Sequence, residues 1–252
     1  MTALLETDGL TVTFGGLRAV DDLSLRVEEG TLVGLIGPNG AGKTTCIDAL
    51  TGFVPSRGAI RLDGQDVRGL GAHERARLGL GRTWQSLELF DDLTIRENLQ
   101  VAAERQTFAG YLADLFRPGR PRDHSAVDAA LDLVGLGHLA GRKPTEISQG
   151  QRKLVGVARA LAARPRIVCM DEPAAGLDSS ESRDLGRELR RVVEGGTAIL
   201  LVDHDMGLVL EVCDRIYVIE FGALIAEGTP AEIQRHPAVI EAYLGTSTEA
   251  GA

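Results

Sequence analysis

Gly37-Pro38-Asn39-Gly40-Ala41-Gly42-Lys43-Thr44 is the stretch that decides the fold, because it matches the phosphate-binding pattern GxxxxGK[ST]. In this pattern the glycines let backbone N–H groups point at phosphate oxygens, and the start of the following helix adds partial positive charge. The lysine reaches the β and γ phosphates, and the threonine hydroxyl is a ligand for Mg²⁺. Residues 31–36 predict a buried strand and residues 42–51 a helix, which is the context that the mechanism needs. The alternative, a glycine-rich turn without a ligand, does not require that context.

Two adjacent carboxylates follow a second buried strand. The run from Ile167 to Asp171 is apolar up to its last residue, and Glu172 comes next. Because parallel α/β sheets bind ligands at the carboxyl ends of their strands, we expect Asp171 to hold Mg²⁺, directly or through water. Glu172 is expected to activate the attacking water as a general base. A solvated strand end is the alternative, but adjacent carboxylates repel each other unless a cation or a proton uses them.

His204 follows a third apolar run, residues 199–203, so we expect it at the same edge of the sheet as Lys43 and Asp171. There its side chain would contact the γ phosphate, whereas the alternative is an ordinary surface histidine. The residues expected around the phosphates and the metal are Gly37, Pro38, Asn39, Gly40, Ala41, Gly42, Lys43, Thr44, Thr45, Asp171, Glu172 and His204. This set indicates a Mg²⁺-nucleotide hydrolase or kinase.

Hydrophobic patterning elsewhere predicts an α/β domain. Residues 4–14 and 21–27 alternate apolar and polar residues, which is typical of antiparallel strands. The apolar runs 167–171 and 197–203, with the helical stretch 180–194 between them, predict a strand–helix–strand unit and a parallel sheet.

A helical region is predicted between these two sets of strands. Thr94 and Glu97 predict a capping box at the start of a helix over residues 94–103, and residues 151–163 predict another helix. Residues 105–125 mix glycine, proline and arginine, so we expect a mobile insertion or lobe boundary there.

Composition excludes several classes of protein. The chain has 252 residues, which suits one large domain or one domain with a small second lobe. Its three cysteines form no CxxC pair, so neither a disulfide framework nor a zinc site is expected. A net charge of −9 without a basic patch argues against nucleic acid as a partner. The sequence has neither a signal-peptide pattern nor an apolar run near the roughly 20 residues of a membrane-spanning helix.

Ile147-Ser148-Gln149-Gly150-Gln151 selects one family among the nucleotide hydrolases and kinases. The segment resembles the LSGGQ signature of the ABC ATPases and, as in that family, comes about 20 residues before the acidic end of a strand. Ser148 and Gly150 open a helix whose N-terminus can bind an anion. In the ABC family the signature of one subunit closes on the ATP held by another. The resemblance therefore implies a dimer in which Ser148, Gly150 and Gln151 face the partner's nucleotide.

The same resemblance assigns further residues. It implies that Gln85 is the Q-loop glutamine, which senses Mg²⁺ and the attacking water, and that His204 is the switch histidine. Asp178 matches the D-loop, in Gly176-Leu177-Asp178, beside the nucleotide. Phe14 falls where the family stacks an aromatic ring on adenine, a contact worth about 1–3 kcal/mol. The alternative for Phe14 is a core residue of its strand.

Finer matches are similar to the ATP-binding subunits of branched-chain amino-acid importers. They span Phe14 to Val20, Arg82 to Gln85, Asp171 to Leu177, Asp203 to Met206, Ala226 to Pro230 and Tyr243 to Gly245. Related importers also carry amides, urea and other small polar solutes. The chain departs from these subunits at Trp84, Ile147 and Gln149, and at Cys46, where an aliphatic residue is usual. Because Cys46 lies near a helix N-terminus, its thiol is predicted to have a depressed pKa and to be reactive.

The resemblance implies a fold and a set of cofactors. The fold class is α/β: a P-loop NTPase of the ABC type, with a mostly parallel core sheet, an N-terminal antiparallel β subdomain and a helical lobe. The ATP-binding domain is expected over residues 1–245, with the helical lobe at about 86–163 and a flexible tail over 246–252. The implied cofactors are ATP and Mg²⁺.

The implied function is ATP hydrolysis that powers import of branched-chain amino acids or a related small polar solute. The implied partners are transmembrane permease subunits, a second ABC ATPase subunit and, indirectly, a solute-binding protein. The implied place is the cytoplasmic face of the inner membrane. Trp84, Leu87, Leu89 and Phe90 are candidates for docking on the permease, or else core residues of the helical lobe.

Two alternative functions are open to the sequence. A soluble ABC ATPase acting in assembly or on nucleic acid needs a coiled-coil insertion, a second ATPase domain or a basic face, and the sequence has none of these. A P-loop kinase would not need the signature, the D-loop or Glu172.

Overall fold

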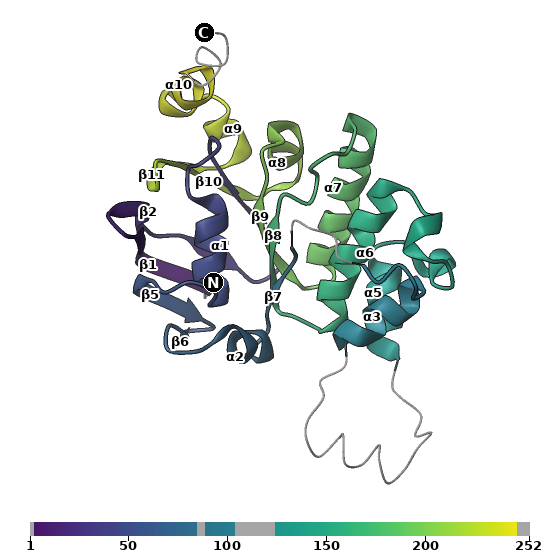
Figure 1. Cartoon of the computed structure of the whole chain (residues 1–252). Coiled ribbons are helices and arrows are strands. Elements are labelled where there is room, and N and C mark those ends of the chain that lie inside the picture. Colours follow the sequence, from purple (N-terminus) through teal and green to yellow (C-terminus); the bar gives the residue numbers. More distant parts are fainter. Residues whose placement is uncertain (1–2, 85–88, 104–123, 246–252) are drawn as a thin grey trace. The chain divides into compact units, whose positions relative to one another are not determined.

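The chain forms two compact units (Figure 1). The computed structural model describes residues 3–84, 89–103 and 124–245. The first unit contains residues 1–85 and 165–252, and the second contains residues 86–164. Gln85, Leu87, most of the predicted insertion at 105–125 and the predicted tail at 246–252 lie outside the described residues.

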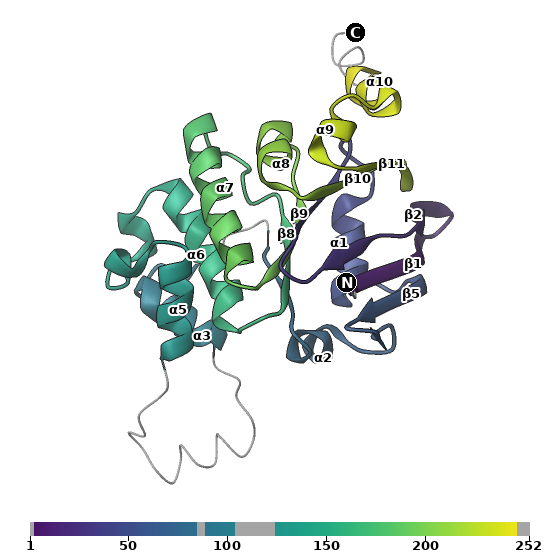
Figure 2. The same ribbon diagram turned by 180° about the vertical axis from the view of Figure 1, so that it is seen from behind.

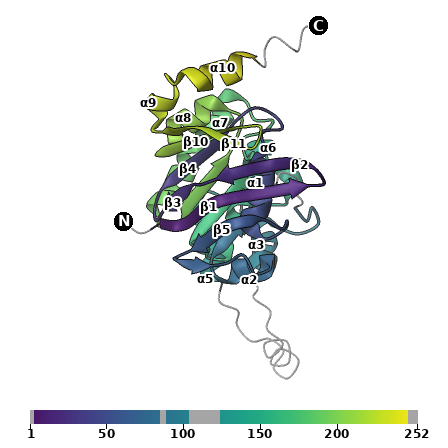
Figure 3. The ribbon, with the colours of Figure 1, turned by 90° about the vertical axis from the view of Figure 1, so that its left-hand side faces the viewer.

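An antiparallel sheet near the N-terminus belongs to the first unit. Its strand order is β2-β1-β5-β6, and β3 also pairs with β1. The strands are β1 (Ala3–Phe14), β2 (Leu17–Leu23), β3 (Arg26–Glu28), β5 (Arg57–Leu62) and β6 (Gln65–Asp66). Figure 3 looks onto β1, β2 and β5 from the side of this sheet.

A six-stranded sheet is the other half of the first unit. Its order is β11-β10-β4-β9-β8-β7, with all neighbours parallel except the β10–β11 hairpin. The strands are β4 (Leu32–Ile36), β7 (Leu80–Arg82), β8 (Ile167–Asp171), β9 (Ala198–Val202), β10 (Arg215–Glu220) and β11 (Ala223–Gly228). Every residue of β4, β8 and β9 is buried, as expected for parallel strands covered on both faces.

Helices cover the six-stranded sheet on both faces. Helix α1 (Lys43–Thr51) packs between the two sheets, and its Ile47 and Leu50 join the core that both sheets share. Figure 2 shows α7 (Ser179–Glu194) and α8 (Met206–Val212) on the opposite side of β8 and β9 from α1. The other helices of this unit are α2 (Ala72–Arg77), α9 (Pro230–Ile233) and α10 (Pro237–Gly245).

The second unit is helical. Its elements are α3 (Ile95–Ala103), α5 (Ser125–Leu133), η1 (Gly137–Leu139), η2 (Pro144–Glu146) and α6 (Gln149–Ala162). The α-helices that the structure describes in this unit pack on one another. The capping box predicted before α3 is present, since Glu97 accepts from the Thr94 N–H at 2.7 Å and the Thr94 hydroxyl accepts from the Glu97 N–H at 3.2 Å. The buried Asn98 side chain fixes the preceding loop by bonding both backbone groups of Phe90.

The predicted fold class is confirmed, with one strand wrong. Residues 21–27 were expected to form a single strand, but the chain divides there between β2 and β3. The Thr7 hydroxyl causes the break, because it donates to the Leu23 carbonyl at 3.0 Å and accepts from the Leu25 N–H at 3.0 Å. The sequence patterns also missed the short elements α2, β7 and α8.

Candidate functional site

The loop of residues 37–42 connects β4 to α1 and needs glycine at two of its positions. A Cβ on Gly37 would lie 2.0 Å from the Ile219 carbonyl oxygen, and a Cβ on Gly42 would lie 2.1 Å from that of Ala19. Gly42 also has φ near +101°, a conformation that side chains disfavour. The backbone can therefore follow this path only without side chains at these positions.

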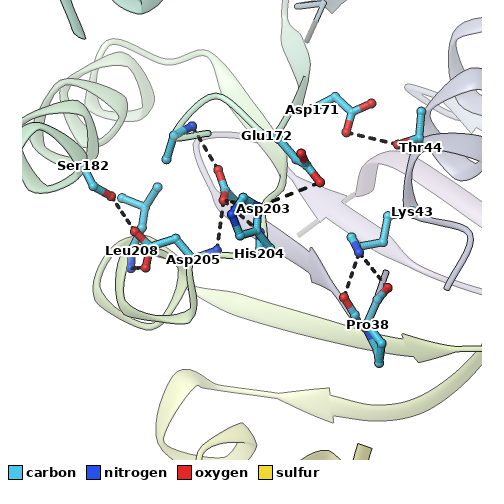
Figure 4. Close-up of polar contacts among 12 residues, drawn as sticks. Pro38, Lys43, Thr44, Asp171, Glu172, Ser182, Asp203, His204, Asp205 and Leu208 are labelled. Atoms are coloured by element: carbon cyan, nitrogen blue, oxygen red, sulfur yellow. Dashed lines mark hydrogen bonds and ion pairs between the residues drawn. The ribbon is translucent and has the colours of Figure 1, made fainter. Parts of the chain in front are cut away.

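Lys43 is the first residue of α1, and its side chain is buried beneath the loop. Its Nζ donates to the carbonyl oxygens of Gly37 at 2.7 Å and Pro38 at 2.9 Å, as Figure 4 shows. Burial lowers the pKa of Lys43, and the carboxylates of Glu172, Asp171 and Asp203 oppose that shift. The ammonium is thus aimed at the loop that would hold phosphate.

Thr44 and Asp171 place two oxygen donors side by side. The Thr44 hydroxyl donates to Asp171 Oδ1 at 3.4 Å, and Asp171 is almost completely buried. Burial raises the pKa of Asp171, while the Thr44 hydrogen bond and the charge of Arg82 oppose the rise. Oxygen atoms from a hydroxyl and a carboxylate are the ligands that Mg²⁺ prefers. The donor set therefore fits the predicted metal.

Arg82, at the end of β7, ties this pair to its surroundings. Its guanidinium lies 2.5 Å from Asp48 Oδ1 and 3.9 Å from Asp171 Oδ2. The same group stacks on the Trp84 ring at 4.2 Å from the centroid, and Phe53 meets that ring edge-on. Arg82 begins one of the matched segments, but the sequence assigned it no role, because its partners come from α1 and β8.

Glu172 and His204 face each other across the ends of β8 and β9. The His204 Nδ1 lies 3.9 Å from Glu172 Oε1, and the two residues are partly open to solvent (Figure 4). Glu172 has φ near +49°, an unusual conformation for a residue other than glycine. Its backbone N–H donates to the Val202 carbonyl at 2.7 Å, which holds the start of the segment after β8 against β9.

The sheet explains why these groups converge. In the parallel register, Leu35 of β4 is opposite Val202 of β9, and Asp171 of β8 is opposite the same Val202. Three neighbouring strands therefore end at one edge, and each is followed by a part of the candidate site. The structure brings together Lys43, Thr44, Asp171, Glu172 and His204 as the sequence predicted, although their catalytic roles stay predictions.

Comparison with known proteins identifies the family. The ABC transporter family model matches residues 20–175, more than half of the chain. The chain belongs to the ABC transporter family. It is an ATPase cassette of such a transporter. A second family model, described as the branched-chain amino acid ATP-binding cassette transporter, matches residues 223–248 of the cassette.

Relatives of the cassette cover almost its full length. A high-affinity branched-chain amino acid transport ATP-binding protein, BraF of Pseudomonas aeruginosa, is 45% identical over 96% of the cassette and 98% of its own length. LivG of Salmonella typhimurium, described in the same words, is 43% identical with the same coverages. The cassette also matches the ADP conformation of an ABC transporter's ATP-binding cassette, with a TM-score of 0.85 and 29% identity over 97% of this chain and all of the other.

Other predicted contacts of the ABC cassette lie on separate elements. Phe14 is the last residue of β1 and is about half exposed, so its ring is not part of the core. Asp178 is exposed and caps α7 by accepting the N–H groups of Ser180 at 2.7 Å and Glu181 at 2.9 Å. In the second unit, the exposed Ser148 caps α6, accepting from the Gln151 N–H at 3.2 Å. The helix starts at Gln149, two residues before the predicted start.

The reactivity predicted for Cys46 is wrong. Its side chain points into the core of the ABC cassette and is fully buried. Burial raises the pKa of the thiol far above its ordinary value, so loss of hydration outweighs any effect of the helix N-terminus.

The candidate docking residues of the ABC cassette differ in exposure. Trp84, in the first unit, and Phe90, in the second, are about half exposed, whereas Leu89 is buried. Leu89 therefore suits the core of the helical unit better than a docking surface. None of the helices in the described ranges has both the length and the apolar composition needed to cross a bilayer.

Proposed function

We propose that this ABC cassette powers the import of branched-chain amino acids or a related small polar solute. The observation that carries the proposal is the matching of residues 223–248 by a family model specific to branched-chain amino acid cassettes. Two relatives at 43–45% identity bear the corresponding name. A soluble assembly factor or a nucleic-acid enzyme has no comparable support from the acidic chain.

ATP with Mg²⁺ is the proposed fuel. Lys43 and the N–H groups of residues 39–44 would bind the phosphates, and Thr44, Asp171 and Gln85 would hold Mg²⁺. The metal would neutralise charge on the phosphates. Glu172 would accept a proton from the attacking water, and His204 would contact the γ phosphate from the neighbouring strand end. Phe14, exposed at the end of β1, would stack on adenine.

The cassette is proposed to act as a pair on the cytoplasmic face of the inner membrane. Ser148, Gly150 and Gln151 at the start of α6, with Asp178 at the start of α7, would meet the nucleotide of a second cassette, either a copy or a relative. Permease subunits would receive the motion and a solute-binding protein would deliver the solute. The exposure of Ser148 and Asp178 supports these contacts, since both residues lie at the surface at the starts of α6 and α7.

Solute uptake tests the proposal most directly. Cells of the source organism that lack this chain would be supplied with the wild-type protein or with Lys43→Ala. Uptake of labelled leucine, valine, urea and a small amide would then be compared. The proposal is supported if the wild-type protein restores uptake of the amino acids and Lys43→Ala does not. If the wild-type protein restores uptake of only urea or the amide, that compound is the solute. If it changes the uptake of none of the four compounds, the proposal is contradicted.

A further inference from the structure

Asp203 is a buried carboxylate that the assigned motifs leave without a role. It follows β9 directly and has no exposed surface. It lies between the segment that follows Glu172 and the segment that begins with His204, as Figure 4 shows. A buried carboxylate is costly unless hydrogen bonds replace its lost water, so its partners indicate what it holds in place.

Both oxygens of Asp203 accept hydrogen bonds from backbone N–H groups. Oδ1 accepts from His204 at 2.8 Å and from Asp205 at 3.0 Å, while Oδ2 accepts from Ala174 at 3.1 Å. One carboxylate therefore binds the chain after β8 and the chain after β9. Hydrogen bonds to a charged acceptor are stronger than those between neutral groups, so the two segments are held firmly.

The two segments carry the groups that are proposed to act on the γ phosphate and its attacking water. Glu172 is two residues before Ala174, and its Oε1 lies 3.9 Å from the His204 ring. The His204 Nδ1, from which that distance is measured, lies 3.6 Å from Asp203 Oδ1. Asp203 itself has no exposed surface through which to touch a nucleotide, so any effect on the reaction must pass through its neighbours.

We propose that Asp203 is a positioning residue for ATP hydrolysis, because its two oxygens fix the distance between the Glu172 segment and the His204 segment. The proposal rests on the proposed function, in which these two side chains act on one nucleotide. A small displacement of catalytic groups is enough to slow a reaction, and a shift of about 1 Å can cost about 100-fold in rate.

A separate anchor lets the fold survive loss of this link. The Asp205 carboxylate accepts from the Ser182 hydroxyl at 2.7 Å and from the Leu208 N–H at 3.1 Å. These bonds attach the His204 segment to α7 and α8 without Asp203. A change at Asp203 is therefore expected to alter the geometry of the site more than the stability of the unit.

Asp203→Asn tests the proposal on the full chain. The amide keeps one oxygen for the N–H groups of His204 and Asp205, but its NH₂ group cannot accept from Ala174. We expect kcat for ATP to fall at least about tenfold, with the Kd for Mg-ATP within about threefold of wild type. Faster hydrogen exchange at the Ala174 amide would show the broken bond directly.

Asp214→Asn is the matched control. Asp214 also binds a backbone N–H, that of Leu32 at 2.8 Å, but this lies at the other end of β4. We expect kcat and Kd to stay at wild-type values in that variant. Ala174→Pro removes the same bond from the donor side, and we expect it to lower kcat as Asp203→Asn does.

A double-mutant cycle shows whether Asp203 acts through the histidine. In a His204→Ala background, Asp203→Asn should change kcat less than about threefold, since the distance between the Glu172 and His204 segments no longer matters once the imidazole is gone. The proposal is overturned by an Asp203→Asn chain with wild-type kcat, or by full additivity with His204→Ala. A wild-type chain that hydrolyses no ATP would instead contradict the proposed function.

Discussion

The Thr44 hydroxyl lies 3.4 Å from the Asp171 carboxylate, although 127 positions separate the two residues in the chain. Parallel pairing of β4 and β8 with the same strand, β9, brings them together. The phosphate loop and the acidic strand end are therefore two halves of one site.

Lys43 is expected to dominate nucleotide binding. Lys43→Ala removes a buried ammonium from beneath the loop, and a charged hydrogen bond is worth about 1.5–3 kcal/mol. Mg-ATP should bind about 10- to 100-fold more weakly, as measured by equilibrium titration. Lys143→Ala, at one of the two other lysines of the chain, serves as the control and should leave the Kd unchanged. Equal affinities for Mg-ATP in the two variants would show that Lys43 does not contribute to nucleotide binding.

Asp171 is expected to set the requirement for Mg²⁺. In Asp171→Asn the Mg²⁺ concentration that half-saturates ATP binding should rise at least about tenfold, because a charged metal ligand is lost. Asp48→Asn is the control, since Asp48 also pairs with Arg82 but is not part of the Thr44–Asp171 contact. A similar rise in both variants would show that Arg82 pairing, and not metal ligation, causes the effect.

Gly42 should be needed for stability for two reasons: its backbone conformation disfavours a side chain, and the Ala19 carbonyl leaves no room for one. Gly196 has a similar φ, near +94°, but a Cβ there would meet nothing within 4 Å, so it isolates conformational strain from the clash at Gly42. Gly196→Ala should lower the free energy of unfolding by about 1–2 kcal/mol. Gly42→Ala should lower it by more than about 3 kcal/mol, as measured by urea denaturation. Equal losses would mean that the loop relaxes away from Ala19.

The cysteines should be inert while the chain is folded. Cys46, Cys169 and Cys213 are all buried, and burial raises the pKa of each thiol, that of Cys169 to about 12. At pH 8 the native chain should take up no maleimide, whereas the chain in urea should take up three, as read by mass spectrometry. Labelling of native Cys46 at the rate of a free thiol would restore the reactivity predicted from the sequence.

Local patterns predicted the parts of the site that depend on nearby residues. The loop with Lys43 and Thr44 is a continuous motif, and the strands before Glu172 and His204 are short apolar runs with polar ends. Parallel pairing is then enough to predict that these ends lie together, because the carboxyl ends of neighbouring parallel strands lie at the same edge of the sheet.

Contacts between distant elements were not predictable in this way. Arg82 reaches Asp171, and Asp203 reaches Ala174, only when β7, β8 and β9 are side by side, and the spacing of the local residues does not signal either contact. Cys46 was misjudged for the same reason, since the position near a helix N-terminus is local whereas burial depends on both sheets. The break after Leu23 likewise requires Thr7 from another strand.

ATP turnover by Glu172→Gln tests the central claim most directly. The amide keeps the size of the side chain but cannot act as a general base, a role worth about 10²- to 10⁴-fold in rate. We predict that kcat falls within this range while Mg-ATP binds with wild-type affinity. Turnover at the wild-type rate would contradict the account, since the water at this site would then be activated by a group other than Glu172.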